Sequence, residues 1–263
     1  MALVKTVIDG REVEVERDRW ALDVAREMGI DIPTLCHHPA LEPYGACRLC
    51  VVEVTRGKWT WLTTSCDLPI REGLEIRTDT ENVKKARRMA LELLWAQAPE
   101  AEVIQRMARE MGVEKPRFAP REGLGKCILC GLCVRVCREI LGESAISFSK
   151  RGADRVVTTP FADASSDCIG CGACVAVCPT GHIVAEYDRA TLKLETGNTD
   201  LELAACKKCG GPYLPRRMLE RLEKQCGETV DDLGLCPKCR AGSTVDKWSE
   251  ALRLAATAGR RGL

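Results

Sequence analysis

The chain has 263 residues, of which 45% are hydrophobic and 4% aromatic, enough for two or three small domains with modest cores. Its 39 lysines and arginines nearly balance its 38 aspartates and glutamates, so a formal net charge of +1 gives no general attraction to nucleic acid or anionic lipid. No apolar run approaches the length of a membrane span. Protein partners are therefore favoured.

The 17 cysteines are the main compositional feature. An odd number with repeated pairs two residues apart is typical of thiolate ligation rather than of a disulfide framework. The first twenty residues contain no basic segment followed by an apolar run, so we expect no secretory leader and a reducing, cytoplasmic setting.

The first 80 residues predict a small mixed sheet packed on one helix. An alternation of valine and glutamate behind Asp9-Gly10 is typical of a hairpin with a type I′ turn. Apolar residues at helical spacing follow over 21–28, and Gly29 is a suitable left-handed cap. Further strands are predicted at 50–54 and 74–78.

Residues 81–119 are predicted to form a helical spacer, interrupted near Ala98-Pro99 and without histidine or cysteine. Residues 120–187 contain two dense cysteine runs, separated by a short strand expected at 156–158, which form an internal repeat of about forty residues. The basic residues expected on the solvated face of the spacer helix are Lys84, Lys85, Arg87 and Arg88.

The two cysteine runs each have the spacing C-x2-C-x2-C-x3-C, and they give the most specific signal in the chain. Three thiolates on one tight loop cap three corners of an iron-sulfur cube, and the fourth cysteine of each run ligates the other cube. Gly131, Gly170 and Gly172 lie between ligands, where a small residue lets the backbone curl round the cube. The predicted [4Fe-4S] ligand sets are Cys127, Cys130, Cys133 and Cys178, and Cys168, Cys171, Cys174 and Cys137.

A further set, Cys36-x10-Cys47-x2-Cys50-x15-Cys66, departs from the plant ferredoxin spacing. Within TLCHHPALEPYGACRLCVVEV and TTSC it resembles the N-terminal [2Fe-2S] domain of three groups of proteins. These are the large iron-sulfur subunit of respiratory complex I, the diaphorase subunits of NAD-linked hydrogenases, and the iron-only hydrogenases. The resemblance implies a β-grasp ferredoxin fold for residues 1–80, with one [2Fe-2S] cluster on Cys36, Cys47, Cys50 and Cys66.

The resemblance extends to about residue 187, through EGLEIRTDTENVKKARRMALELLWA, KCILCGLCVRVCREI and DCIGCGACVAVCPT. The chain departs from these relatives in one respect, because they usually place a His-x3-Cys-x2-Cys-x5-Cys site in the spacer. Residues 81–126 contain none of those ligands. The second four-cysteine run favours the hydrogenase-like diaphorase subunits over complex I proper.

The last segment, residues 188–263, has paired cysteines on either side of a helix expected over 215–225. Cys206, Cys209, Cys236 and Cys239 form two knuckles of the type that holds tetrahedral zinc, although a third [4Fe-4S] cluster on the same residues is the alternative. Cys226 is left over and is expected to be a free buried thiol. The fold class is therefore α+β: a β-grasp [2Fe-2S] domain, a helical spacer, a two-[4Fe-4S] ferredoxin-like domain and a small zinc-ribbon-like module.

The three histidines carry less information. His37 and His38 stand next to Cys36 and could tune or ligate a cluster, whereas His182 is expected to pack or to cap a turn. No glycine-rich phosphate loop, flavin fingerprint or Ser-His-Asp set occurs, so no catalytic residue is predicted.

The resemblance implies an electron-transfer subunit of an NAD(P)-linked oxidoreductase. Its expected partners are a flavin- and NAD(P)-binding subunit and a catalytic subunit of the hydrogenase or formate dehydrogenase type, with an electron-bifurcating complex left open. Two alternatives are a freely diffusing ferredoxin-type carrier, for which the near-neutral charge is unfavourable, and a redox-sensing scaffold protein.

Overall fold

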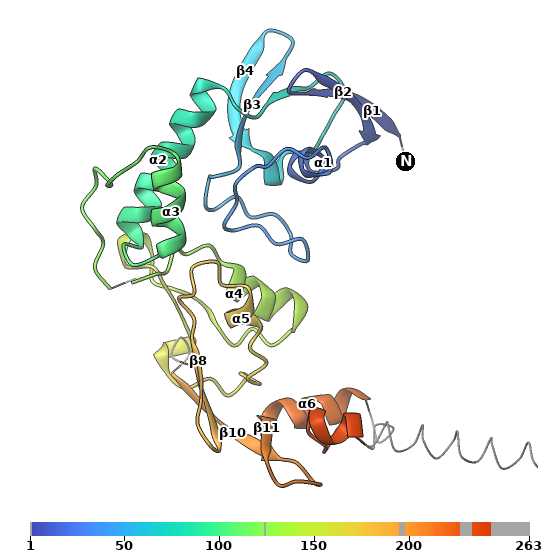
Figure 1. Ribbon diagram of the computed structural model, residues 1–263, viewed down its shortest axis with the longest axis vertical. Coiled ribbons are helices and arrows are strands. Elements are labelled where there is room, and N and C mark those ends of the chain that lie inside the picture. Colours follow the sequence, from blue (N-terminus) through green and yellow to red (C-terminus); the bar gives the residue numbers. More distant parts are fainter. Residues whose placement is uncertain (1, 124, 195–197, 227–232, 243–263) are drawn as a thin grey trace, which may run out of the picture. The chain divides into compact units, whose positions relative to one another are not determined.

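The computed structural model describes residues 2–123, 125–194, 198–226 and 233–242 (Figure 1). The chain divides into two compact units: unit 1 comprises residues 1–157 and 173–183, and unit 2 comprises residues 158–172 and 184–263. Helices and strands are mixed in both units. Over the described ranges, no helix combines the length and the apolar character needed to cross a membrane.

Unit 1 begins with a five-stranded sheet in the order β2-β1-β5-β3-β4, in which only the β1–β5 pairing is parallel. The predicted type I′ turn is confirmed, because Asp9 (φ 47°) and Gly10 (φ 78°) both adopt left-handed conformations. The predicted helix and its cap at Gly29 (φ 78°) are confirmed as well. The elements are β1 (Leu3–Ile8), β2 (Arg11–Glu16), α1 (Ala21–Glu27), β3 (Val51–Arg56), β4 (Trp59–Thr64), a 3-10 turn η1 (Ser65–Asp67) and β5 (Glu75–Arg77).

Strand β4 is the element of this sheet that the sequence reading does not foresee. It is an edge strand, and its first four residues are exposed on both faces, with Trp59 at 79%. An edge strand that buries neither face lacks the alternation of apolar and polar residues by which half-buried strands are recognised. The other strands, β3 and β5, match their predicted positions to within two residues.

The sheet and α1 share one apolar core, and two predicted ligands belong to it. Leu22 of α1 packs with the sheet residues Ile8 and Val52, and Cys50 and Cys66 are part of the same cluster. These two thiols are therefore held in rigid and largely apolar surroundings.

The spacer forms the two helices α2 (Glu81–Gln97) and α3 (Glu102–Glu110), with the predicted interruption at Ala98-Pro99. Thr80 caps α2, since its Oγ1 accepts a hydrogen bond of 3.2 Å from the Val83 amide. Leu91 and Ile104 of these helices belong to a second apolar core, which also contains the predicted ligands Cys36, Cys47 and Cys130.

The rest of unit 1 is made of short turns around cysteines. Gly131, at φ 76°, starts the short helix α4, and a Cβ there would lie 3.3 Å from the Phe148 ring, so the position needs glycine. The strand expected at 156–158 is confirmed as β7. The elements are α4 (Leu132–Arg135), a π-helical turn η2 (Val136–Ile140), β6 (Ser147–Ser149), a 3-10 turn η3 (Gly152–Asp154), β7 (Val156–Thr158) and α5 (Ala173–Ala176).

Unit 2 contains a four-stranded sheet in the order β11-β10-β9-β8, with antiparallel pairings. The predicted helix is present as α6, but the sequence analysis does not predict the sheet. The elements are a 3-10 turn η4 (Pro160–Ala162), β8 (Ala185–Tyr187), β9 (Thr191–Leu194), β10 (Thr199–Ala205), β11 (Pro212–Pro215) and α6 (Arg216–Cys226).

Candidate metal centres

No disulfide occurs among the cysteines whose side chains the structure describes, as expected for thiolate ligands. The side chain of Cys226, the predicted free thiol, lies outside the described part of the chain. The remaining cysteines gather in unit 1 and unit 2, in the sets that follow.

The N-terminal four-cysteine site, Cys36, Cys47, Cys50 and Cys66, is fully buried in unit 1. Cys36 and Cys47 lie on the long loop between α1 and β3, Cys50 directly precedes β3, and Cys66 lies in η1. The amide of Cys47 donates a hydrogen bond of 3.3 Å to the Sγ of Cys36. Main-chain donors of this kind stabilise negative charge on a ligating sulfur.

The four thiols act as two pairs. The Cys36 thiol donates to Cys47, which lowers the pKa of Cys47 to about 6 and raises the pKa of Cys36. The Cys66 thiol donates to Cys50 in the same way, which lowers the pKa of Cys50 to about 7 and raises the pKa of Cys66. Two pairs of neighbouring sulfurs suit a two-iron cluster, in which each iron takes two thiolates. These residues therefore fit the group that the resemblance implies.

A buried arginine joins this site to the next cysteine run, and the sequence reading misses it. Arg135 is only 5% exposed, and its guanidinium donates to the carbonyl oxygens of Glu42 and, at 3.3 Å, of Cys36. The guanidinium also lies 5.2 Å from the centre of the Tyr44 ring. Because Arg135 stands between Cys133 and Cys137 in the sequence, it connects one ligand loop to the other.

The expectation that Arg87 faces solvent is wrong. Arg87 is 6% exposed, and its guanidinium donates a hydrogen bond of 2.8 Å to the carbonyl oxygen of Val51, directly after the ligand Cys50. Burial lowers the pKa of Arg87. An amphipathic pattern assigns every charged residue to the solvated face, so it cannot identify a cation that satisfies a buried carbonyl.

Cys127, Cys130, Cys133 and Cys178 also come together in unit 1. Burial raises the pKa of Cys127, raises that of Cys130 to about 11, and raises that of Cys133 still further. The charge of Cys178 adds to this effect at Cys127 and Cys130, and the charge of Cys47 adds to it at Cys130. Because metal ligation requires the thiolate, these three thiols must release their protons when a cluster binds.

Cys178 differs from its three companions. Burial acts to raise its pKa, but hydrogen bonds from the amides of Ile183, Thr180 and His182 and from the Thr180 hydroxyl outweigh burial, and the pKa is lowered. The His182 amide lies 3.3 Å from the Sγ of Cys178 and the Thr180 Oγ1 lies 3.6 Å from it. The main chain of His182 thus contributes to the turn around the ligand, whereas the predicted packing or capping role of its side chain stays a prediction.

The structure places the predicted second [4Fe-4S] set only in part. Cys137 and Cys174 pack beside Cys133 in a third apolar cluster of unit 1, and the amide of Ala145 donates a hydrogen bond of 3.3 Å to the Sγ of Cys137. Cys168 and Cys171 belong to unit 2. The assignment of these four residues to one cluster stays a prediction.

The C-terminal four-cysteine site lies in unit 2. The four sulfurs of Cys206, Cys209, Cys236 and Cys239 all lie within 4.8 Å of one another, and those of Cys209 and Cys236 are 3.9 Å apart. The Cys236 amide, 3.2 Å from the Sγ of Cys206, is the main cause that lowers the pKa of Cys206 to about 6. A proton shared with Cys236 raises the pKa of Cys239 to about 12. This set is able to bind a metal ion.

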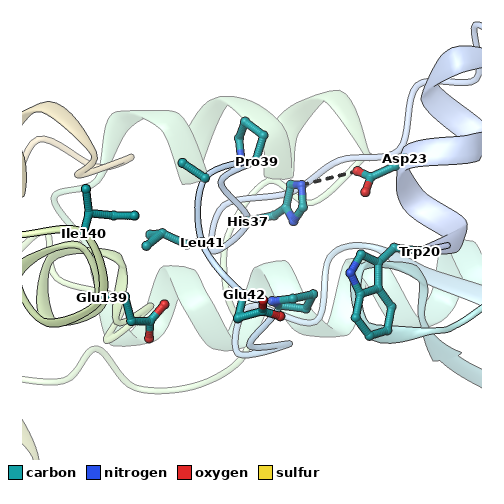
Figure 2. A pocket seen from close by; sticks show the side chains of 10 residues that line it. Trp20, Asp23, His37, Pro39, Leu41, Glu42, Glu139 and Ile140 are labelled. Carbon is teal, nitrogen blue, oxygen red and sulfur yellow. Dashed lines mark ion pairs between the residues drawn. The ribbon is translucent and has the colours of Figure 1, made fainter. Parts of the chain in front are cut away.

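Beside the N-terminal site, unit 1 has a pocket of about 480 Å³ (Figure 2). His37 lines it with its side chain 6% exposed, and its Nε2 lies 3.7 Å from a carboxylate oxygen of Asp23. Burial lowers the pKa of His37 even though Asp23 acts in the opposite direction. His38 is engaged locally, since its Nδ1 accepts a hydrogen bond from the Ala40 amide. These contacts favour packing roles over ligation for both histidines.

Comparison with known proteins gives the class to which these sites belong. Residues 2–81 match a family model described as a 2Fe-2S iron-sulfur cluster binding domain. Residues 126–182 and 164–213 match two models described as 4Fe-4S dicluster domains. These ranges of the chain therefore contain ferredoxin-type domains of both kinds.

Its relatives include subunits of NADH- and NADPH-linked oxidoreductases. The chain is 30% identical over 208 residues to the NADPH-Fe(3+) oxidoreductase subunit alpha of Geobacter sulfurreducens, covering 70% of this chain and 24% of the relative. It is 27% identical over 212 residues to the mitochondrial NADH-ubiquinone oxidoreductase 78 kDa subunit of Candida albicans, covering 71% of this chain and 29% of the relative. The chain thus spans 24% and 29% of the length of these two relatives.

A solved structure of similar fold is a chain of the NAD+-reducing [NiFe]-hydrogenase in the H2-reduced state. The TM-score is 0.59 at 25% sequence identity, and the match covers 82% of this chain and 95% of that chain. The predicted relation to hydrogenase-type iron-sulfur subunits and to the large iron-sulfur subunit of complex I is confirmed.

Proposed function

We propose that this chain is an electron-transfer subunit of a multi-subunit NAD(P)-linked oxidoreductase and that it performs no bond chemistry of its own. Bound iron-sulfur clusters accept and pass on single electrons; the chain positions them, buries them and supplies hydrogen bonds to their sulfurs. The proposed ligands are the predicted ones: Cys36, Cys47, Cys50 and Cys66 for [2Fe-2S], and Cys127, Cys130, Cys133 and Cys178, and Cys168, Cys171, Cys174 and Cys137, for two [4Fe-4S].

The observation that carries the proposal is the continuity between two of these sites within unit 1. Cys36 and Cys47 of the N-terminal site and Cys130 of the next site belong to one buried apolar core. Burial is the main cause that raises the pKa of Cys130 to about 11, and the charge of Cys47 makes a smaller contribution in the same direction. Two ligand sets that share one buried apolar core suit outer-sphere electron transfer, because little reorganisation accompanies each transfer.

The C-terminal site is better suited to one zinc ion than to a third cubane. Four thiolates about 2.3 Å from a single tetrahedral ion lie about 3.8 Å apart. Thiolates on the four corners of a cubane lie roughly 6 Å apart. The observed limit of 4.8 Å for all four sulfurs, and 3.9 Å for Cys209 and Cys236, favours the single ion. A zinc-ribbon-like role for residues 188–263 follows from this choice.

The domain plan that accompanies this function is the predicted one. It comprises a β-grasp [2Fe-2S] domain over 1–80, a helical spacer over 81–119 and a two-cluster domain over 120–187. The proposed partners are a flavin- and NAD(P)-binding subunit and a catalytic subunit of the hydrogenase or formate dehydrogenase type, in the cytoplasm. The similarity to a chain of an NAD+-reducing [NiFe]-hydrogenase supports the first of these catalytic types.

Metal analysis of protein purified without oxygen tests the proposal. We expect about ten irons, about ten acid-labile sulfides and one zinc per chain, from one two-iron cluster, two four-iron clusters and one ion. About two irons would contradict the two cubanes, and about fourteen irons without zinc would make the C-terminal site a further cluster.

Cysteine variants locate the clusters within the chain. Cys127→Ser is expected to lose or convert one four-iron cluster and to alter its electron paramagnetic resonance signal. Cys226→Ser is the matched control, because Cys226 is no proposed ligand, and its metal content should equal that of the parent. Reduction by NAD(P)H of the chain alone would contradict the role of a relay that depends on a flavin-bearing partner.

A further inference from the structure

Helix α6 of unit 2 reaches the loop that carries two proposed cluster ligands. This loop, residues 165–172, includes Cys168 and Cys171 and is named the cluster loop here. The Nη1 atom of Arg217 donates to three of its carbonyl oxygens, at 2.8 Å for Ser165, 3.2 Å for Ser166 and 3.4 Å for Cys168. One guanidinium on α6 thus binds three carbonyl oxygens of the loop, and the third belongs to Cys168, a proposed cluster ligand.

The sheet of unit 2 contacts the same loop independently. Gly170 lies so close to the sheet that a Cβ on it would be 2.6 Å from carbons of Leu201 in β10 and Pro215 in β11. The amide of Ser165 donates a hydrogen bond of 3.2 Å to the hydroxyl of Thr199 at the start of β10. The cluster loop therefore packs against β10 and β11 and is also hydrogen-bonded to α6.

The C-terminal four-cysteine site fixes the elements that make these contacts. Cys206 directly follows β10 and Cys209 precedes β11, and β11 runs into α6 without a break. Among the described residues, the second knuckle is joined to the first part of the module by hydrogen bonds from the Cys236 amide to Cys206, from the Lys207 amide to the Gly234 carbonyl at 2.9 Å, and from the Tyr213 hydroxyl to the Leu233 carbonyl. An ion bound to all four thiolates would lock β10, β11 and the start of α6 together.

We propose that the C-terminal site and Arg217 form one clamp on the cluster loop, with Arg217 as a positioning residue for the [4Fe-4S] cluster assigned to Cys168, Cys171, Cys174 and Cys137. The inference rests on the proposed function, because it requires that cluster. The metal ion sets the position of α6, and the hydrogen bonds of Arg217 hold the backbone of the cluster loop in a fixed position relative to α6. The clamp fixes the backbone of the loop that carries Cys168 and Cys171, and its positive charge favours the reduced, more negative cluster.

The experiment measures cluster retention and potential in the full chain purified without oxygen. Arg217→Gln removes the three contacts and Cys239→Ser removes the metal ion. Arg216→Gln is the matched control, because Arg216 is the neighbouring residue on α6 and its guanidinium pairs with Glu202, 3.0 Å away, outside the cluster loop. Iron released after exposure to air and the midpoint potentials of the clusters are recorded for each variant.

After exposure to air, Arg217→Gln and Cys239→Ser should each release about four irons per chain, at a rate about fivefold above that of the parent. The rate of iron release from Arg216→Gln should equal that of the parent. The double variant should release iron no faster than the faster of the two single variants, because both changes break the same connection. Arg217→Lys should recover part of the retention. The midpoint potential of one cluster should fall in Arg217→Gln.

Several results would overturn the clamp. Full iron retention with unchanged potentials in zinc-free Cys239→Ser would show that the metal site does not act on the loop. Equal iron release and equal potentials in Arg217→Gln and Arg216→Gln would show that Arg217 has no positioning role. Additive effects in the double variant would show that Arg217 and the metal site act on the loop independently. A parent protein that lacks the second cubane would overturn the clamp together with the proposed function, whereas the other outcomes leave that function standing.

Discussion

Replacement of Arg135 by methionine tests the connection between the two ligand loops of unit 1. The change removes the hydrogen bonds to the carbonyl oxygens of Glu42 and Cys36 and the contact with the Tyr44 ring. Hydrogen bonds from a charged group contribute about 1.5–3 kcal/mol each, and a cation-π contact about 0.5–2 kcal/mol. Methionine fills part of the space and avoids burying a charge, which offsets several kcal/mol. We expect a net loss of about 3 kcal/mol in the free energy of unfolding.

Cluster loss makes unfolding irreversible, so the measurable quantity is the rate at which the visible absorbance bleaches in a fixed concentration of guanidinium without oxygen. If half of the lost stability appears in that rate, Arg135→Met bleaches about tenfold faster than the parent. Arg138→Met, at an exposed arginine that pairs with the adjacent Glu139, should change the rate by less than about twofold. Equal rates for the two variants would refute the bridging role of Arg135.

Three further outcomes follow from the sites. Gly170→Ala places a methyl group 2.6 Å from neighbouring carbons and should reduce stability by about 1–3 kcal/mol more than Gly142→Ala, with a loss of iron content. Gly142 has the same φ of 72° but no atom within 4 Å of an added Cβ, so equal effects would contradict the close packing at Gly170. Thr180→Val removes a hydroxyl from Cys178 and should lower the midpoint potential of one four-iron cluster by roughly 20–60 mV in a redox titration, and a rise would contradict the assignment. The pKa of Cys239 is raised to about 12, so this thiol must release its proton when metal binds. Zinc affinity, measured in competition with a chelator, should therefore rise about tenfold per pH unit for each proton released between about pH 6.5 and 8. An affinity that does not change with pH would refute this.

The cysteine spacings and local turn signals predicted much of the structure. Asp9-Gly10, Gly29 and the break at Ala98-Pro99 are determined by residues close in sequence, and the structure places each feature where it was expected. Likewise, the sulfurs of Cys206, Cys209, Cys236 and Cys239 gather as the two-knuckle pattern predicted. Local chemistry suffices in these cases because the relevant partners lie a few residues away or repeat at a recognisable spacing.

The features that the sequence did not disclose depend on long-range partners. Arg87, Arg135 and Arg217 bind carbonyl oxygens 36, 93 and 52 residues away along the chain. A charged residue that satisfies distant backbone has the same sequence signature as one in solvent, so a pattern of polarity cannot separate the two. Strand β4 was missed for a different reason, because its first four residues are exposed on both faces. Strand β10 does alternate between buried and exposed residues, so its pattern could have indicated a strand.

The apolar core shared by Cys36, Cys47 and Cys130 has a consequence for how the protein is assembled. Leu35, Leu41 and Leu49 of the first ligand loop are buried in that core together with Leu91 of α2 and Leu132 of α4. A fragment cut after residue 80 would leave those three leucines without their covering residues and open to water. Maturation of unit 1 should therefore be cooperative: loading iron into one ligand loop stabilises the other, and partly loaded molecules should be rare during reconstitution.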